Sequence, residues 1–313
     1  MAFRADRRPS ARALANESVL ALGRLDLRAR VVVDGFLSGL HRSPYHGFSA
    51  EFSEYRAYSP GDDLRYLDWK LLGRTDRRYV KRFEDETNLA CQILVDASGS
   101  MGFGGEGRAS KLDHAITLAA ALARLLSQQR DAVGLVTFDA DFVDVVPARW
   151  RPGHLQRLFA TLEQTRPGAD TGLAEILQRV AAVTRRRGLV VLLSDLLTPT
   201  EGLDEAFGQL RARGQDVLLF RVLDPDEVAF PFEDSARFED LESGRRLYVD
   251  PGEARTNYRS RFEAHARELE ELALDHGLDG STWTTDRPLV ELLHDVLAAR
   301  SRRARQVARG GRR

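Results

Sequence analysis

The sequence predicts an α/β fold with a mainly parallel sheet and helices on both of its faces. From residue 88 to residue 224, short uninterrupted apolar runs alternate with longer segments in which apolar residues recur at helical spacing. Uninterrupted runs are typical of strands buried on both faces, and their alternation with amphipathic helices favours parallel pairing. Only residues 139–141 separate two of these strands, so that pair must be antiparallel and one of the two must lie at an edge.

Each element follows from one of these two patterns. Short apolar or β-branched segments predict strands, in chain order at residues 89–95, 132–138, 142–146, 189–193, 217–222 and 281–285. The segments with helical spacing predict helices, in chain order at residues 111–129, 154–165, 173–186, 203–213, 252–276 and 288–302. Gly188 is a stop signal after the third of these helices, and Pro288 suits the first turn of the last.

A β-hairpin and two less regular parts complete the expected organisation. Residues 236–241 and 245–249 flank a Glu-Ser-Gly turn, which predicts a hairpin inserted beside the main sheet. We therefore expect three parts: an N-terminal segment, residues 1–88; the main domain, residues 89–300, with the insertion near residues 226–250; and a basic tail, residues 301–313.

Composition narrows the class of protein. The 46 basic and 47 acidic residues nearly cancel, so bulk charge does not suggest a nucleic-acid partner, and the arginine-rich ends are expected to be solvated tails. The single cysteine, Cys91, lies in an apolar run and has no intrachain partner for a disulfide. No signal peptide is evident, and no apolar run approaches the roughly 20 residues that a membrane-spanning helix needs. We expect a cytoplasmic protein without a membrane span.

Oxygen-bearing side chains follow three of the predicted elements. Asp96, Ser98 and Ser100 come directly after the first strand, Thr171 precedes a helix, and Asp195 ends the strand at residues 189–193. The carboxyl ends of parallel strands share one edge of a sheet, so these five side chains are expected to converge there. Carboxylates and hydroxyls suit Mg²⁺, with Mn²⁺ or Ca²⁺ as alternatives, whereas zinc prefers His or Cys. A simpler interpretation, turn and helix-capping residues without a metal, stays open because the motif is short.

With these residues the chain resembles the von Willebrand factor A fold and its metal-ion-dependent adhesion site. The resemblance implies that one divalent cation is held by these residue types and that a partner's Glu or Asp completes its coordination. It thus implies a protein-interaction module rather than an enzyme.

The N-terminal segment carries a second and more specific resemblance. Its motifs are Gly39-Leu40-His41-Arg42-Ser43, Glu51-Phe52-Ser53-Glu54-Tyr55-Arg56-Ala57-Tyr58, Gly61-Asp62-Asp63-Leu64-Arg65-Tyr66-Leu67-Asp68-Trp69-Lys70 and Gly73-Arg74-Thr75. Together with the A-like domain they resemble the domain-of-unknown-function 58 (DUF58) family. That resemblance implies a partnership with a MoxR-type AAA+ ATPase and a client protein that offers a carboxylate, in complex assembly, maturation or metal insertion.

Charged and aromatic residues within that segment admit two interpretations. Arginine pairs with carboxylates and stacks on aromatic rings, so one interpretation is a salt-bridged network that pins the segment to the main domain. The other is a docking surface for the ATPase, because Tyr, Trp and Arg dominate interface hot spots. The residues concerned are Arg56, Tyr58, Asp62, Asp63, Arg65, Asp68, Trp69 and Arg74.

A magnesium-dependent hydrolase is the alternative function. Asp96 would be the nucleophile of a phosphatase-like reaction, as a carboxylate at the end of a first strand. Phosphatases of that geometry carry a second aspartate two residues later, where this chain has Ser98. No lysine that would clamp a phosphate is evident near Asp96, so the interaction module is the preferred interpretation.

Overall fold

The computed structural model describes most of the chain beyond residue 89 and part of what precedes it. The described residues are 17–42, 55–57, 79–81, 90–168, 170–184, 187–234, 236–239, 241 and 244–296. The contacts divide the chain into a small unit within residues 39–88 and a large unit formed by the residues on either side. In the small unit, β1 (Tyr55–Ala57) and β2 (Tyr79–Lys81) pair antiparallel.

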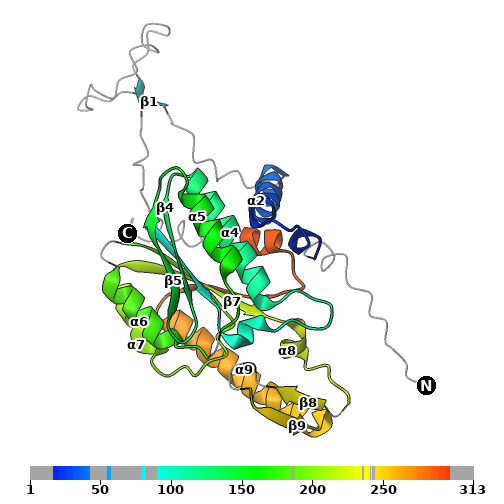
Figure 1. Ribbon diagram of the computed structural model, residues 1–313. Helices are drawn as coiled ribbons and strands as arrows, with labels where there is room; N and C mark the ends of the chain where they lie inside the picture. The colour runs from blue at the N-terminus through cyan, green and yellow to red at the C-terminus, as the bar shows by residue number, and fades with distance from the viewer. Residues whose placement is uncertain are drawn as a thin grey trace. The chain divides into compact units, whose positions relative to one another are not determined.

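A six-stranded sheet forms the centre of the large unit (Figure 1). Its strands are, in spatial order, β10 (Asp279–Thr284), β7 (Gln215–Leu223), β6 (Gly188–Ser194), β3 (Ala90–Asp96), β4 (Ala132–Phe138) and β5 (Phe142–Arg149). All neighbours pair parallel except β4 and β5, which are antiparallel, so β5 is the antiparallel edge strand. This arrangement confirms the predicted von Willebrand A-like α/β architecture.

Helices cover both faces of this sheet. Helices α6 (Leu173–Val183) and α7 (Leu203–Ala212) share one apolar cluster with Leu94 of β3, Leu192 of β6 and Leu269 of α9 (Pro251–Asp275). Helices α4 (Lys111–Gln128) and α5 (His154–Gln164) pack against each other and on the strands. Successive strand side chains point to opposite faces, so the neighbours of Leu94 in β3 turn to the α4 side. Cys91 is buried in this strand, as expected.

Helix α2 (Leu25–Arg42) was not anticipated, and it changes the expected division of the chain. Its Ala29, Val32, Val33 and Phe36 are buried, and the Phe36 ring lies 4.7 Å from the His294 ring. The helix up to residue 38 therefore belongs with the large unit, whereas we had placed residues 1–88 together in one segment. Its apolar face is spaced for a helix and needs the large unit to bury it.

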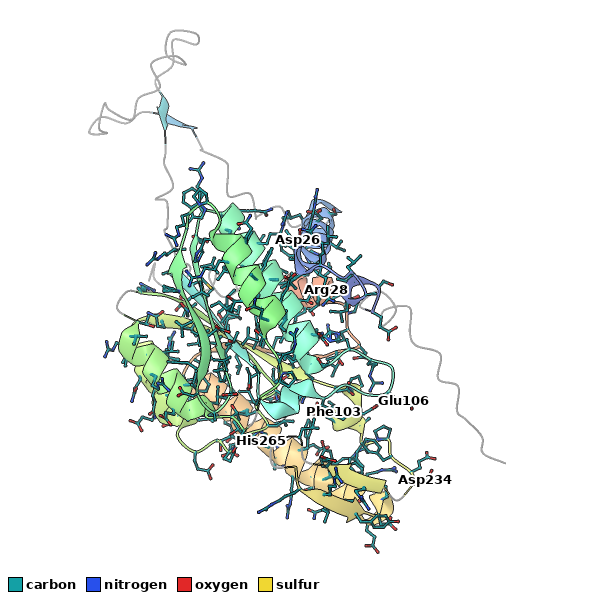
Figure 2. The ribbon with its side chains drawn as sticks, viewed as in Figure 1. Asp26, Arg28, Phe103, Glu106, Asp234 and His265 are labelled. Carbon is teal, nitrogen blue, oxygen red and sulfur yellow. The ribbon has the colours of Figure 1, made fainter. Side chains whose placement is uncertain are left out.

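The predicted hairpin is present as β8 (Ala236–Glu239) and β9 (Arg246–Val249), which pair antiparallel. Aromatic rings of Phe230, Phe232 and Phe238 pack together, and Phe230 also contacts Tyr258 of α9. Figure 2 shows His265 farther along α9, where its Nε2 lies 2.6 Å from the carbonyl oxygen of Leu196, just after β6. Helix α9 thus extends from the hairpin to the carboxyl end of β6, in the middle of the sheet. None of the helices in the described ranges is both long and apolar enough to cross a membrane.

A buried histidine couples the fold to pH. His114 of α4 is 3% exposed and contacts Trp283 edge-on at 5.5 Å, and its Nδ1 lies 3.1 Å from the carbonyl oxygen of Ser110. Burial lowers the pKa of His114 from 6.5 to about 4. Asp113 and Asp224 oppose this lowering, and Arg28 adds to it.

We expect His114 to make the protein sensitive to mild acid. The unfolded chain takes up a proton at this ring near pH 6.5, whereas the folded chain does so only near pH 4. The contribution of His114 to the free energy of unfolding should therefore fall as the pH drops from 6.5 to 4, by up to about 3 kcal/mol. Asp96 at the end of β3, whose pKa is raised to about 7, contributes in the opposite sense over this range, so the test is the difference between two proteins. Urea unfolding across this range should show wild type losing stability relative to His114→Asn, whose amide does not titrate. Equal changes in both proteins would contradict the assignment.

Candidate functional site

The candidate site lies where the strand order reverses. The chain leaves β3 toward β4 on one side and leaves β6 toward β7 on the other, so the crevice beyond the ends of β3 and β6 is a switch point. Ligands of open α/β sheets gather at such points. Asp96 is the last residue of β3, and Asp195 directly follows β6.

Asp96 is held rigidly at this point. The residue is only 1% exposed. Its Oδ1 accepts a hydrogen bond from the Ser98 amide at 2.9 Å, and its Oδ2 accepts one from Ser194 Oγ at 2.6 Å. Burial and then the negative charge of Asp195 raise the pKa of Asp96 to about 7. Two carboxylates that repel each other in a buried setting are a place where a cation lowers the energy.

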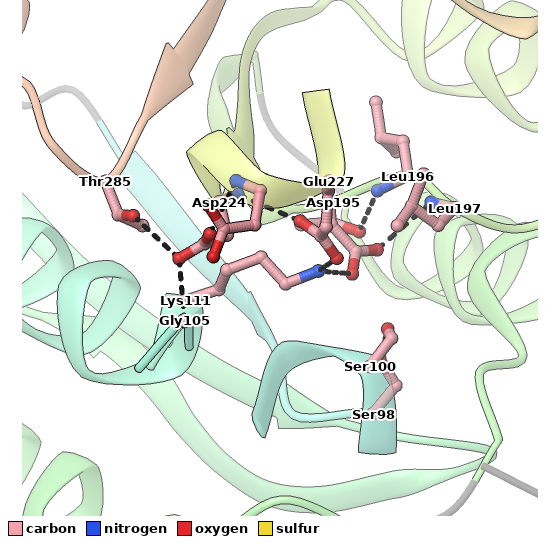
Figure 3. A network of polar contacts seen from close by, with 12 residues as sticks. Ser98, Ser100, Gly105, Lys111, Asp195, Leu196, Leu197, Asp224, Glu227 and Thr285 are labelled. Atoms are coloured by element: carbon pink, nitrogen blue, oxygen red, sulfur yellow. Dashed lines mark hydrogen bonds and ion pairs between the residues drawn. The ribbon is translucent and has the colours of Figure 1, made fainter. Parts of the chain in front are cut away.

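The two serines share one side of the site. Ser98 directly precedes the short 3-10 turn η2 (Gly99–Gly102), and Ser100 lies within it. Their Oγ atoms are 3.2 Å apart. Figure 3 shows the two serines in the same view as Lys111 and Asp195. The turn places alternate side chains together because its backbone bends immediately after the strand.

Thr171 sits on a loop that docks against the same crevice. The Gly168 amide donates to the Ala97 carbonyl at 2.6 Å, and the Gly172 amide donates to the Asp139 carbonyl at 3.1 Å. A Cβ at position 172 would lie 2.8 Å from the backbone carbonyl oxygen of Ala140, so glycine permits this close approach of the two loops. Thr171 Oγ1 is buried and has no hydrogen-bond partner among the residues that the structure describes. A buried hydroxyl without a partner is costly, and a ligand is one explanation for it.

Asp195 has an unexpected cationic partner. Lys111, the first residue of α4, is 0% exposed, and its Nζ lies 2.7 Å from Asp195 Oδ2 and 2.5 Å from Glu227 Oε1 of α8 (Pro225–Ala229). The other oxygen of Asp195 accepts from the Leu197 amide at 3.0 Å. Burial alone lowers the pKa of Lys111, but the attraction of Asp195 and Glu227 outweighs it, so the pKa is raised and the amine stays charged.

Lys111 and Glu227 were both missed by the sequence analysis. The sequence shows no phosphate-clamping lysine near Asp96; a lysine does reach the site, but its ammonium pairs with Asp195 and Glu227. The carboxylate Glu227 also accepts the Asp224 amide at 2.8 Å as part of a capping box at the start of α8. The sequence Asp-Pro-Asp-Glu at residues 224–227 is typical of such a capping box, but it does not predict the ion pair between Glu227 and Lys111.

A second ion cluster anchors the neighbouring loop (Figure 3). Asp224 is 0% exposed and accepts from Arg108 at 2.7 Å and from the Gly105 amide at 3.1 Å. Burial raises the pKa of Asp224, but the hydrogen bonds from Arg108 and from the Asp226 and Gly105 amides prevail, so the pKa lies below its usual value. The loop after η2 is thereby tied to the start of α8.

The residues present fit a hard divalent cation. Three hydroxyls and two carboxylates are oxygen donors of the kind that Mg²⁺ accepts, and the partnerless Thr171 Oγ1 is free to act as a ligand. Among the described residues, no group of three or more His, Cys, Asp or Glu side chains is placed to share a metal ion, so the hydroxyls would have to supply the remaining ligands. The set of oxygen donors, and not a cavity, identifies the ends of β3 and β6 as the candidate site. A cavity of 640 Å³ lies elsewhere in the large unit, between α2, α4 and α5, and none of the five candidate ligands lines it.

The expected docking residues of the N-terminal segment fall mostly outside the described part of the chain. Arg56 lies in β1. The remaining seven lie outside the described residues: Tyr58, Asp62, Asp63, Arg65, Asp68, Trp69 and Arg74. Both interpretations of this surface stay predictions.

Solved structures with some likeness to this chain include two Bacteroides proteins. The conserved hypothetical protein BatB from Bacteroides thetaiotaomicron is 17% identical, with a TM-score of 0.46 over 68% of this chain and 99% of that one. An aerotolerance-related membrane protein from Bacteroides fragilis is 18% identical, with a TM-score of 0.47 over 67% and 99%. The SpRpn10 VWA domain is 12% identical, with a TM-score of 0.32 over 43% and 75%.

Relatives in sequence cover between half and nine-tenths of the chain. The "Uncharacterized protein Rv1480" of Mycobacterium tuberculosis is 31% identical over 289 residues, which is 91% of this chain and 90% of that protein. The "Uncharacterized protein MAV169" of Mycobacterium avium is 29% identical over 51% of this chain and 95% of its own length. The family model described as "Protein of unknown function DUF58" matches residues 54–271. With most of its large unit and β1–β2 inside that match, the chain belongs to the DUF58 family.

Proposed function

We propose that this protein is a metal-dependent protein-interaction module. A divalent cation, Mg²⁺ in the first instance, is held by Asp96, Ser98, Ser100, Thr171 and Asp195. When bound, the cation supplies a Lewis-acidic position for one carboxylate of a partner protein. The observation that carries the proposal is the buried Thr171 hydroxyl without a partner, on a loop docked beside two mutually repelling carboxylates.

Binding fits this geometry better than hydrolysis. A nucleophilic carboxylate must present an oxygen to its substrate, but Asp96 is 1% exposed and each of its oxygens accepts a hydrogen bond within the protein. Lys111 is likewise fully buried and shared by two carboxylates. An ammonium held in this way is poorly placed to clamp a phosphate.

The partners follow from the family resemblance and belong to the same proposal. A MoxR-type AAA+ ATPase supplies the energy of ATP hydrolysis, and a client protein offers the carboxylate, in complex assembly, maturation or metal insertion. The present chain supplies recognition, in which Asp96 and Asp195 set the charge of the site and the three hydroxyls define where the cation sits.

The test is capture of partners by the tagged protein from its native lysate, with Mg²⁺ or with chelator, followed by mass spectrometry. We expect an AAA+ ATPase or a client to be recovered with Mg²⁺ and lost with chelator. Ser98→Ala should lose the partner under both conditions, because it removes a proposed ligand without altering the buried backbone. Ser38→Ala, an exposed serine on α2, is the matched control and should behave as wild type.

Direct metal binding completes this test. Titration calorimetry with MgCl₂ should detect binding to the wild-type protein and to Ser38→Ala, and not to Ser98→Ala. Capture of the same partners under all conditions, together with no heat of metal binding, would refute the proposal.

A further inference from the structure

A buried ammonium stands beside a carboxylate that the proposed cation also needs. Lys111 is 0% exposed, and its Nζ lies 2.7 Å from Asp195 Oδ2. Because the Leu197 amide already occupies Asp195 Oδ1, the lysine uses the oxygen that is otherwise open. Two cations beside one carboxylate repel each other, and burial weakens the screening by water.

Glu227 gives the same ammonium a second place to bind. Its Oε1 lies 2.5 Å from Lys111 Nζ, and its Oε2 is fixed by the Asp224 amide at 2.8 Å. Figure 3 shows the lysine side chain reaching both carboxylates together. A lysine that loses Asp195 to a metal would therefore still have a charged partner, and would not become an unpaired buried charge.

The charges around the site are nearly balanced without a metal. Counted in their ionised forms, Asp96, Asp195 and Glu227 contribute three negative charges here, and Lys111 and Arg221 contribute two positive charges. Arg221 is 5% exposed, and its Nε donates to the Asp195 carbonyl at 3.2 Å. The formal charge of this group is −1, so a divalent ion brings it to +1. One carboxylate of a partner would then restore neutrality.

We propose that Lys111 sets the metal affinity of the site by competing for Asp195, and that Glu227 moderates this competition by holding the ammonium. The inference rests on the proposed function, because it needs the divalent cation to bind. It makes Lys111 a positioning residue of the site, which tunes metal occupancy without being a ligand. Because Lys111 lowers the metal affinity of the site, the cation binds chiefly when a partner's carboxylate serves as an additional ligand.

Four proteins separate this role from a structural one: wild type, Lys111→Met, Glu227→Gln and the double variant. Methionine is close to lysine in length and carries no charge, so it suits a fully buried position. Titration calorimetry with MgCl₂ and MnCl₂ measures their affinities, and circular dichroism checks that each is folded. Arg157→Met, which removes an exposed cation on α5, is the control for unspecific effects of charge.

We expect Lys111→Met to bind the metal at least about tenfold more tightly than wild type, since it removes a buried like charge. Glu227→Gln should bind several-fold more weakly, because the ammonium then has Asp195 alone. In the Lys111→Met background the Glu227→Gln change should have little effect, within about twofold. Arg157→Met should match wild type, because exposed charges are screened.

Stability gives a second readout. Metal-free Lys111→Met should unfold at a lower urea concentration than wild type, since Asp195 and Glu227 lose their common partner, and saturating metal should restore much of the difference. Wild-type metal binding that is unchanged or weaker in a folded Lys111→Met would overturn this inference alone. Absence of metal binding in wild type and in every variant would instead defeat the proposed function.

Discussion

Asp224→Ala is expected to lower the free energy of unfolding by about 3–5 kcal/mol, the cost of breaking a buried ion pair by removing one partner. Asp224 is 0% exposed and accepts hydrogen bonds from Arg108 and from the Gly105 and Asp226 amides. It is also the N-cap of α8, whose loss alone costs about 1 kcal/mol. The change thus removes the anchor that joins the loop after η2 to α8.

The matched control for this prediction uses the same arginine. Asp226 also pairs with Arg108, at 2.6 Å, but its side chain is 25% exposed. Asp226→Ala should cost no more than about 1 kcal/mol, because partly exposed pairs are screened by water. Asp224→Asn, which keeps the shape and one acceptor oxygen, should fall between the two. Urea unfolding followed by circular dichroism measures all three, and equal losses for Asp224→Ala and Asp226→Ala would contradict the anchoring role.

The sheet was predictable because its four central strands are buried on both faces. Such strands must be apolar at consecutive positions, so their sequence stands out from the amphipathic helices around them. The expected strand at residues 132–138 coincides with β4, whereas the strand expected at 142–146 extends to residue 149 as β5. The extension was missed because it reads Pro147-Ala148-Arg149, and proline is accepted within a sheet only at an edge, where β5 lies.

Helix α2 was missed although its sequence carries a signal. Leu25, Ala29, Val32, Val33 and Phe36 recur at helical spacing, but Arg and Asp residues stand between them and lower the average hydrophobicity. The helix is stabilised by burial against the rest of the large unit, and a local pattern underestimates such an element.

The candidate site was predictable only where its residues follow an element in the chain. Asp96, Ser98, Ser100 and Asp195 come at the ends of two recognisable strands, and the parallel sheet brings those ends together. Lys111 and Glu227 are 116 residues apart, and their contact depends on how α4 and α8 meet in space. No periodicity or spacing encodes such a contact, which explains why the charge balance of the site emerged only from the structure.

Thr171→Val is expected to change stability and metal affinity in opposite directions. The Thr171 hydroxyl is buried without a partner, so replacing it by a methyl group should raise the metal-free stability by about 1 kcal/mol. The same change removes a proposed ligand, and the affinity for Mg²⁺ should fall by at least about 10–100-fold, the range seen when supporting groups of a metal site are lost. Urea unfolding in chelator and calorimetric titration with MgCl₂ measure the two effects.

Thr137 provides an internal control for this prediction. Its Oγ1 is likewise buried without a partner, but it lies within β4 and outside the set of candidate ligands. Thr137→Val should therefore raise stability by a similar amount and leave metal affinity at the wild-type value. If both valine variants bind Mg²⁺ as wild type does, Thr171 is not a ligand. If only Thr171→Val loses binding, the partnerless hydroxyl is explained by the metal, because burial and loss of a hydroxyl are common to both variants.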